Sequence, residues 1–168
     1  MGFFDKLKGK GAPALDPMTV YAPLSGTAIP LEQVPDPVFS QGVLGPGCGI
    51  EPENGMVYAP FHGTVTQLAD TRHAIGITST DGIEVLIHVG IDTVDMNGKG
   101  FSAKVSEGKS VRKGDLLLEF SLSEIRAAGH PATTVILVTN ADEVGTPRLT
   151  ASGKAESGSP LMKITKNG

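Results

Sequence analysis

The stretch IEVLIHVGIDTVDMNGKGF, residues 83–101, opens with an alternating run that predicts a half-buried β-strand over residues 83–89. One face of this strand carries three aliphatic side chains and is expected to face the core: Val85, Ile87 and Val89. The opposite face carries His88 beside Leu86, so the imidazole should point out of the sheet. The strand therefore raises two questions at once, which fold contains it and what its histidine does.

Short alternating segments recur along the rest of the chain, separated by turns rich in glycine and proline. The 22 Gly and 12 Pro are distributed through the sequence rather than gathered in one linker. This pattern is typical of an all-β sandwich or barrel. Strands are expected over residues 19–24, 56–59, 63–69, 73–79, 83–89, 101–106, 116–120, 133–139 and 161–166, with one short helix at 122–128, capped by Ser121 or Ser123 and ended by Gly129.

Two sequence echoes predict an internally duplicated motif. YAPLSGT at residues 21–27 recurs as YAPFHGT at 58–64, and GKSVRKGDLLLEF at 108–120 is faintly repeated as SGKAESGSPLMKI at 152–164. Two copies are too few for a solenoid. We therefore expect residues 18–168 to form one antiparallel β-sandwich or barrel domain with a duplicated motif and short helical turns.

The composition excludes several classes of function. With 14 Lys+Arg against 18 Asp+Glu, the chain lacks the basic footprint of a nucleic-acid binder. Its single cysteine, Cys48, excludes an internal disulfide and fits a reducing compartment. No apolar run approaches the length of a membrane span and the first residues do not resemble a secretory signal, so we expect a cytoplasmic protein.

Residues 1–17 are expected to form a flexible tail. Phe3, Phe4 and Leu7 would share one side of a short helix with lysines around it, which is the layout of a weak membrane anchor over residues 1–10. One or two helical turns are marginal in water, so the tail is predicted to be disordered in solution.

The predicted hairpin brings a second histidine towards His88. Asp81-Gly82 indicates a two-residue loop, which places Ile75 opposite His88 and makes His73 a diagonal neighbour of His88 on the same face. A three-residue loop would shift the register by one residue and put the two histidines on opposite faces.

Two adjacent imidazoles could hold a metal, relay protons or act as a nucleophile with a helper, or simply satisfy nearby backbone groups. Near neutral pH an imidazole is mostly uncharged and has a free nitrogen lone pair that can accept a phosphoryl group. A hydrogen bond to a backbone carbonyl could fix the tautomer of His88, and Gly90 has no side chain that would crowd such a contact. The Thr71 hydroxyl could orient His73. Spacing alone does not choose among these uses.

The runs EVLIHVGIDTVDMNGKGF, TRHAIGI, VPDPVFS and SEGKSVRKGDLLLEF together resemble the glucose-family enzyme IIA of the bacterial phosphoenolpyruvate-dependent sugar phosphotransferase system. The resemblance extends from about Val20 to Ile164. It implies a β-sandwich phosphotransferase component that takes phosphate from phosphorylated HPr and passes it to the cysteine of a IIB domain of a sugar permease. His88 would then be the phosphoacceptor and His73 the phosphate-stabilising partner, with Thr71 holding His73 and Gly90 supplying a carbonyl to His88.

The same resemblance implies an apolar docking surface with acidic spots. Its positions here are Asp36, Val38, Phe39, Leu86, Asp92 and Val94, the two aspartates being the charges that would meet arginine on HPr. An apolar ring would exclude water from a labile phosphoramidate, while the charges would steer the encounter. Regulated permeases or enzymes would use the same face, so the sequence does not separate carrier from regulator.

Two alternatives remain open at this point. A zinc hydrolase on a related duplicated β scaffold would use His88 and Asp92 in an H-x-x-x-D spacing, but the H-x-H pair such enzymes need is absent. A lipoyl or biotinyl carrier would present Lys113, which lacks the flanking signature. We expect no cofactor and no dedicated metal site, with at most a weak, partner-assisted zinc at His73 and His88.

Overall fold

The computed structural model describes residues 15–151 and 153–166, so most of the tail expected over residues 1–17 lies outside the described part. Its strands are β1 Thr19–Tyr21, β2 Gly26–Pro30, β3 Gly47–Pro52, β4 Met56–Tyr58, β5 Gly63–Leu68, β6 Ala74–Ser79, β7 Glu84–His88, β8 Phe101–Ala103, β9 Ser110–Val111, β10 Leu116–Phe120, β11 Thr134–Val138, β12 Thr146–Leu149, β13 Gly153–Ala155 and β14 Pro160–Thr165. Its helical turns are η1 Leu31–Gln33, α1 Pro37–Ser40, η2 Thr93–Met96, α2 Leu122–Ala127 and α3 Ala141–Val144. The expected all-β architecture with short helical turns is confirmed.

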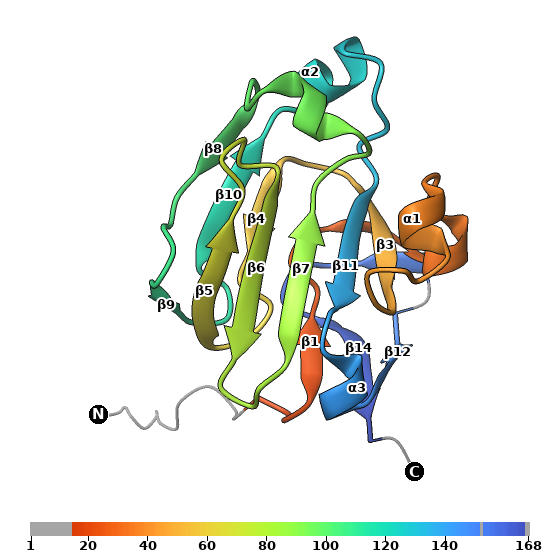
Figure 1. The fold of residues 1–168 in the computed structure, drawn as a ribbon, viewed down its shortest axis with the longest axis vertical. Coiled ribbons are helices and arrows are strands. Elements are labelled where there is room, and N and C mark those ends of the chain that lie inside the picture. Colours follow the sequence, from red (N-terminus) through yellow and green to blue (C-terminus); the bar gives the residue numbers. More distant parts are fainter. Residues whose placement is uncertain (1–14, 152, 167–168) are drawn as a thin grey trace.

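Within this described part the strands form three sheets, and their pairings are antiparallel. The largest sheet has the order β13-β2-β3-β11-β7-β6-β5-β9, and two smaller sheets have the orders β1-β14-β12 and β4-β10-β8. Figure 1 shows β5, β6, β7 and β11 side by side, with α2 beyond the end at which β7 finishes. The inward side chains of β6 and β7 belong to the same buried cluster as Leu117 and Leu161 from the smaller sheets. Burial of this apolar surface between the sheets is the main source of stability.

The strand pairing confirms the duplicated motif. β1 pairs with β14 and β2 with β13, and in the second copy β4 pairs with β10 and β5 with β9. The two copies also exchange equivalent hydrogen bonds, since the Tyr21 amide donates to Pro60 at 3.1 Å and the Tyr58 amide donates to Pro23 at 2.7 Å. The two YAP runs are therefore joined to each other by a reciprocal pair of backbone hydrogen bonds.

Several strands were not predicted because their sequences lack alternation. β3 is the clearest case: Gly47 lies so close to β11 that a Cβ atom would approach the Ile136 carbonyl oxygen to 1.9 Å. Glycine in a strand interior normally argues against a strand, but here it allows close approach of the backbones. The helix expected at 122–128 is confirmed as α2, since Ser121 accepts a hydrogen bond from the Glu124 amide and Gly129 adopts φ +85°.

The predicted register of the β6–β7 hairpin is wrong by one residue. Ala74, not Ile75, lies opposite His88, because residues 80–82 form a three-residue loop closed by the hydrogen bond from the Ser79 amide to the Ile83 carbonyl. The Ser79 hydroxyl accepts from the Asp81 and Ile83 amides, and Gly82 takes the left-handed conformation with φ +89°. This side-chain capping stabilises the longer loop, which the Asp-Gly signal alone does not reveal.

Candidate functional site

The two histidines meet despite the shifted register. Their ring centroids lie 4.8 Å apart with an interplanar angle of 83°. Strand alternation governs residues inside a paired ladder, whereas His73 precedes β6 and follows Arg72, whose φ is +59°. The Val89 amide donates to the His73 carbonyl at 2.8 Å and holds the two chain segments together. The inference that a three-residue loop separates the rings is therefore also wrong.

His88 ends β7 on the outward face, as the alternation predicted. Its Nδ1 lies 2.9 Å from the carbonyl oxygen of Gly90. Because a carbonyl oxygen only accepts, this hydrogen bond requires the proton on Nδ1 and leaves the lone pair of the neutral ring on Nε2. Gly90 reaches back to the ring from a backbone conformation with φ +78°, which glycine adopts without strain.

His73 is held by its neighbour two residues earlier. The Thr71 hydroxyl lies 2.6 Å from His73 Nδ1, and the His73 ring also lies edge-on to Phe101, with centroids 6.4 Å apart. When the hydroxyl donates, the proton of the neutral ring is on Nε2, which is then a hydrogen-bond donor. Among the residues that the structure describes, no hydrogen bond occupies Nε2 of either histidine.

The environment favours the neutral form of both rings. The pKa of His73 is lowered from 6.5 to about 4, mainly by burial and to a smaller extent by the neighbouring His88. Burial also lowers the pKa of His88, although the Gly90 carbonyl and the carboxylates of Asp36 and Asp92 act in the opposite direction. An uncharged His88 with its lone pair on Nε2 is a nucleophile at neutral pH.

The residues expected to form the docking surface differ in how much of each is exposed to solvent. Val38 is 48% exposed and Val94 is 50% exposed. Asp36 precedes α1 and caps it, accepting hydrogen bonds from the Val38 and Phe39 amides. Phe39 itself is buried, and its ring centroid lies 4.9 Å from that of His88, so it packs against the imidazole and contributes little exposed apolar surface.

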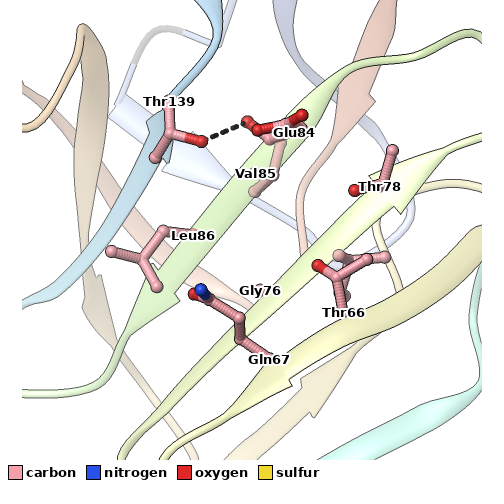
Figure 2. Close-up of a pocket in the computed structure, with 9 residues that line it drawn as sticks. Thr66, Gln67, Gly76, Thr78, Glu84, Val85, Leu86 and Thr139 are labelled. Carbon is pink, nitrogen blue, oxygen red and sulfur yellow. Dashed lines mark hydrogen bonds between the residues drawn. The ribbon is translucent and has the colours of Figure 1, made fainter. Parts of the chain in front are cut away.

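Leu86 lines a groove on the outer face of β5, β6 and β7. This groove has a volume of about 410 Å³ and is lined by Leu86, Glu84 and Thr139 together with polar side chains of β5 and β6. Figure 2 shows Leu86 at one side of the groove and Thr66 and Thr78 at the other. Neither histidine lines it, so the two imidazole rings lie outside this groove.

Sequence reasoning missed Thr93, which belongs to the same motif as His88. Its side chain is completely buried at the start of η2, and its hydroxyl donates to the Val89 carbonyl at 2.5 Å. The only signal was its presence in the H-x-G-I-D-T-V run, which does not distinguish a buried threonine from a surface one. Phe101, beside His73, was expected only as a strand residue.

The two alternative functions find no support in the geometry. Over residues 15–151 and 153–166, no group of three or more His, Cys, Asp and Glu side chains is arranged to hold a metal ion. Lys113 does not project freely as a carrier lysine would, since its ammonium lies 4.5 Å from the centroid of the Tyr21 ring. None of the described helices is long and apolar enough to cross a membrane.

Comparison with known proteins agrees with this geometry. A "PTS system glucose-specific EIIA component" from Bacillus cereus is 44% identical over 163 residues, covering 96% of this chain and 98% of that protein. A "PTS system beta-glucoside-specific EIIBCA component" from Dickeya chrysanthemi is 48% identical over 146 residues, or 87% of this chain. The solved structure of glucose permease IIA from Mycoplasma capricolum matches 86% of this chain and 93% of its own, with a TM-score of 0.77 and 32% identity.

The lengths of these relatives differ. The alignment with this chain covers only 23% of the β-glucoside protein from Dickeya chrysanthemi, but nearly all of the Bacillus cereus protein. Residues 18–144 match the model of the EIIA 1 family of the phosphoenolpyruvate-dependent sugar phosphotransferase system. The match covers most of the described β domain, including both histidines. The chain therefore belongs to the EIIA 1 family of the phosphoenolpyruvate-dependent sugar phosphotransferase system.

Proposed function

We propose that this protein is a phosphocarrier that accepts a phosphoryl group on His88 and passes it to a cysteine of a IIB domain. The observation that carries the proposal is the edge-to-face pair of imidazoles, 4.8 Å between centroids, with both Nδ1 atoms engaged by the protein. This arrangement leaves both Nε2 atoms available for one phosphoryl group. Membership of the family supports the same role.

The roles of the two rings differ because their Nδ1 partners differ. The Gly90 carbonyl holds a proton on His88 Nδ1, so the His88 Nε2 lone pair attacks phosphorus. As that bond forms, the bond between phosphorus and phosphorylated HPr breaks and its electron pair stays with the HPr donor atom. With the Thr71 hydroxyl donating to His73 Nδ1, the His73 Nε2 proton is directed to a phosphoryl oxygen and stabilises the charge there.

Onward transfer reverses the bond changes. The thiolate of the IIB cysteine attacks phosphorus, the bond from phosphorus to His88 Nε2 breaks, and its electron pair returns to that nitrogen. Once the phosphoryl group leaves, His88 is again neutral and ready to accept another. His73, which remains uncharged because burial lowers its pKa, continues to donate its hydrogen bond throughout.

The surface around His88 fits a protein donor. Val38 and Val94 are half-exposed apolar side chains, and Asp36 and Asp92 lie close enough to His88 to act on its pKa. We infer that the apolar side chains exclude water from the phosphoramidate and that the two carboxylates attract basic groups of HPr. A IIB domain or a regulated permease would dock on this same surface after HPr has left.

The test is incubation with phosphoenolpyruvate, enzyme I and HPr, followed by mass spectrometry. The wild-type chain should gain one acid-labile phosphate. His88→Gln should abolish the labelling, whereas His73→Gln should still accept phosphate but transfer it slowly to IIB. The matched control is His62→Gln, because the His62 backbone carbonyl binds the Thr80 amide near the hairpin loop, at the other end of β6. Labelling of His88→Gln would overturn the proposal.

A further inference from the structure

We propose that Thr93 is a positioning residue that fixes the orientation and tautomer of His88 through the turn of residues 89–91. The inference rests on the proposed phosphocarrier function and adds a residue to it. Thr93 does not touch the phosphoryl group in this scheme. It binds the Val89 carbonyl and thereby holds the next residue, Gly90, whose own carbonyl selects which nitrogen of His88 is nucleophilic.

Both ends of the Thr93 side chain contact this turn. Its hydroxyl donates to the Val89 carbonyl at 2.5 Å, and its side chain is fully buried. Its methyl group covers Gly90, since a Cβ atom on Gly90 would lie 2.3 Å from Thr93 Cγ2. Thus one side chain holds the peptide before Gly90 and packs against Gly90 itself.

The rest of the turn is tethered through its amides. The Val89 amide donates to the His73 carbonyl, the Gly90 amide to the Thr133 carbonyl at 3.1 Å and the Ile91 amide to the Pro131 carbonyl at 3.0 Å. The carbonyl of Gly90 is the acceptor left to face the imidazole, 2.9 Å from His88 Nδ1. Thr93 supplies a side-chain hydrogen bond to this set from the side away from His88 Nδ1, so removing its hydroxyl leaves the Val89–Gly90 peptide held by the Gly90 amide alone.

A looser Val89–Gly90 peptide would let Gly90 shift, and with it the carbonyl that faces His88. If the Gly90 carbonyl moves away, Nδ1 loses the acceptor that holds its proton, and the proton can occupy Nε2 instead. A ring protonated at Nε2 has no lone pair there for phosphorus. The effect of losing Thr93 should therefore appear in the tautomer of His88 and in the acceptance rate, and not only in stability.

Two substitutions separate the hydroxyl from the methyl group. Thr93→Val keeps the shape and removes the donor, while Thr93→Ser keeps the donor and removes the methyl group. A matched control is Thr19→Val, because Thr19 is a buried threonine in β1 whose hydroxyl donates to the Pro17 carbonyl at 3.4 Å. The control removes a buried hydroxyl from a strand outside the histidine site.

The primary readout is the pair of imidazole ¹⁵N chemical shifts of His88 in the full chain, which report its tautomer without any phosphotransfer. Thr93→Val should move these shifts towards the Nε2-protonated form and slow labelling by phosphorylated HPr about three- to tenfold, as expected for loss of one hydrogen bond. Thr93→Ser should keep the wild-type shifts and recover most of the rate. Thr19→Val should leave both unchanged.

The outcomes distinguish this inference from the function on which it rests. Wild-type shifts and rate in Thr93→Val, or equal losses in Thr93→Val and Thr93→Ser, would overturn the positioning role. Absence of labelling in the wild-type chain would overturn the phosphocarrier function, while the ¹⁵N shifts would still decide the role of Thr93. If Thr93→Val does not fold, Thr93→Ser and Thr93→Ala are compared, because they differ by the hydroxyl alone.

Discussion

Replacement of Gly90 by alanine tests whether the turn beside His88 is as tightly built as its contacts indicate. The new Cβ atom would lie 2.3 Å from Thr93 Cγ2 and 3.2 Å from the Pro131 carbonyl oxygen, at a residue with φ +78°. The left-handed backbone costs an alanine about 1–2 kcal/mol. Overpacking against Thr93 adds about 1–3 kcal/mol, so Gly90→Ala should lower the free energy of unfolding by about 2–5 kcal/mol.

The two contributions can be measured separately by urea unfolding. Gly108→Ala has φ +90° with nothing within 4 Å of the added Cβ, so it should show the backbone cost alone. Thr93→Ser removes the methyl group that the new Cβ would meet and should relieve the steric part of Gly90→Ala. In the double-mutant cycle, the cost of Gly90→Ala should be about 1–3 kcal/mol smaller in the Thr93→Ser background.

Labelling by phosphorylated HPr provides the functional half of the same experiment. Gly90→Ala should accept phosphate more slowly than wild type, because a displaced Gly90 carbonyl no longer holds the proton on His88 Nδ1. Equal costs of Gly90→Ala in the two backgrounds would refute the steric coupling to Thr93. A Gly90→Ala variant that costs no more than Gly108→Ala would refute the tight packing of the turn.

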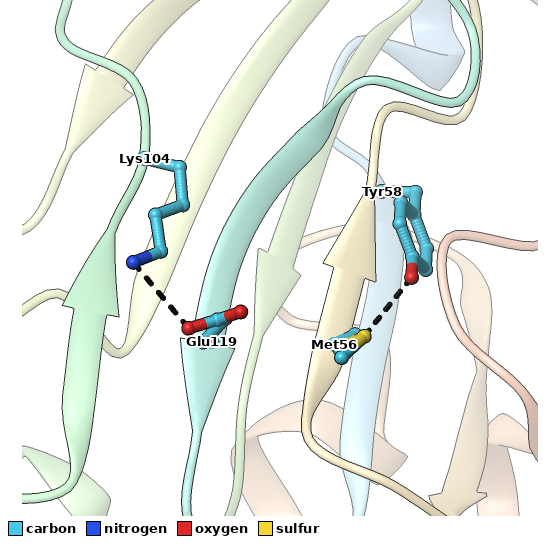
Figure 3. Close-up of polar contacts among 4 residues, drawn as sticks. All are labelled: Met56, Tyr58, Lys104 and Glu119. Carbon is cyan, nitrogen blue, oxygen red and sulfur yellow. Dashed lines mark hydrogen bonds and ion pairs between the residues drawn. The ribbon is translucent and has the colours of Figure 1, made fainter.

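Three further predictions concern acidity and surface charge. The pKa of His73 is about 4 in the folded protein and 6.5 in the unfolded chain, so between these pH values the unfolded chain binds a proton that the folded protein does not. The free energy of unfolding of the wild-type protein, measured in urea, should therefore fall as the pH is lowered from 6.5 to 4. His73→Gln should lose less stability over this range. Asp36→Ala should cost about 1 kcal/mol by removing the cap of α1, while Asp36→Asn should keep the cap and yet slow labelling by HPr; equal stability of the two variants would contradict this. Glu119→Gln removes the exposed ion pair in which Lys104 Nζ lies 3.3 Å from Glu119 Oε1 (Figure 3). It should change the free energy of unfolding by less than about 1 kcal/mol.

The parts of the fold that the sequence predicts are those whose signals are local. The segment of residues 84–89 has three alternate aliphatic side chains, and α2 lies between a serine cap and a terminal glycine that are eight positions apart. The duplicated YAP runs are also visible, because they repeat identical letters at equivalent turns. Periodicity and capping act within a few residues, so no tertiary contact is needed to recognise them.

The parts that could not be predicted depend on distant chain segments. β3 contains Gly47 and Gly49 and ends with Pro52, so it does not look like a strand until β11 lies beside it. The position of Phe39 is a second case, because nothing in VPDPVFS shows that its ring is buried beside the ring of His88. In both cases the deciding contact joins residues too far apart in the sequence for their spacing to reveal it.

The histidine pair shows why the proximity of two side chains can be predicted from an incorrect register. The ladder of β6 and β7 starts at Ala74, so the one-residue shift changes the partners inside the hairpin without dictating where the preceding residue points. His73 is directed instead by the left-handed backbone of Arg72, the hydroxyl of Thr71 and the backbone bond to Val89. The geometry of the histidine pair is therefore set by contacts at the open end of the hairpin. These contacts lie in the TRH and HVGIDT runs themselves, which explains why the two histidines lie together even though the strand register inferred between them was wrong.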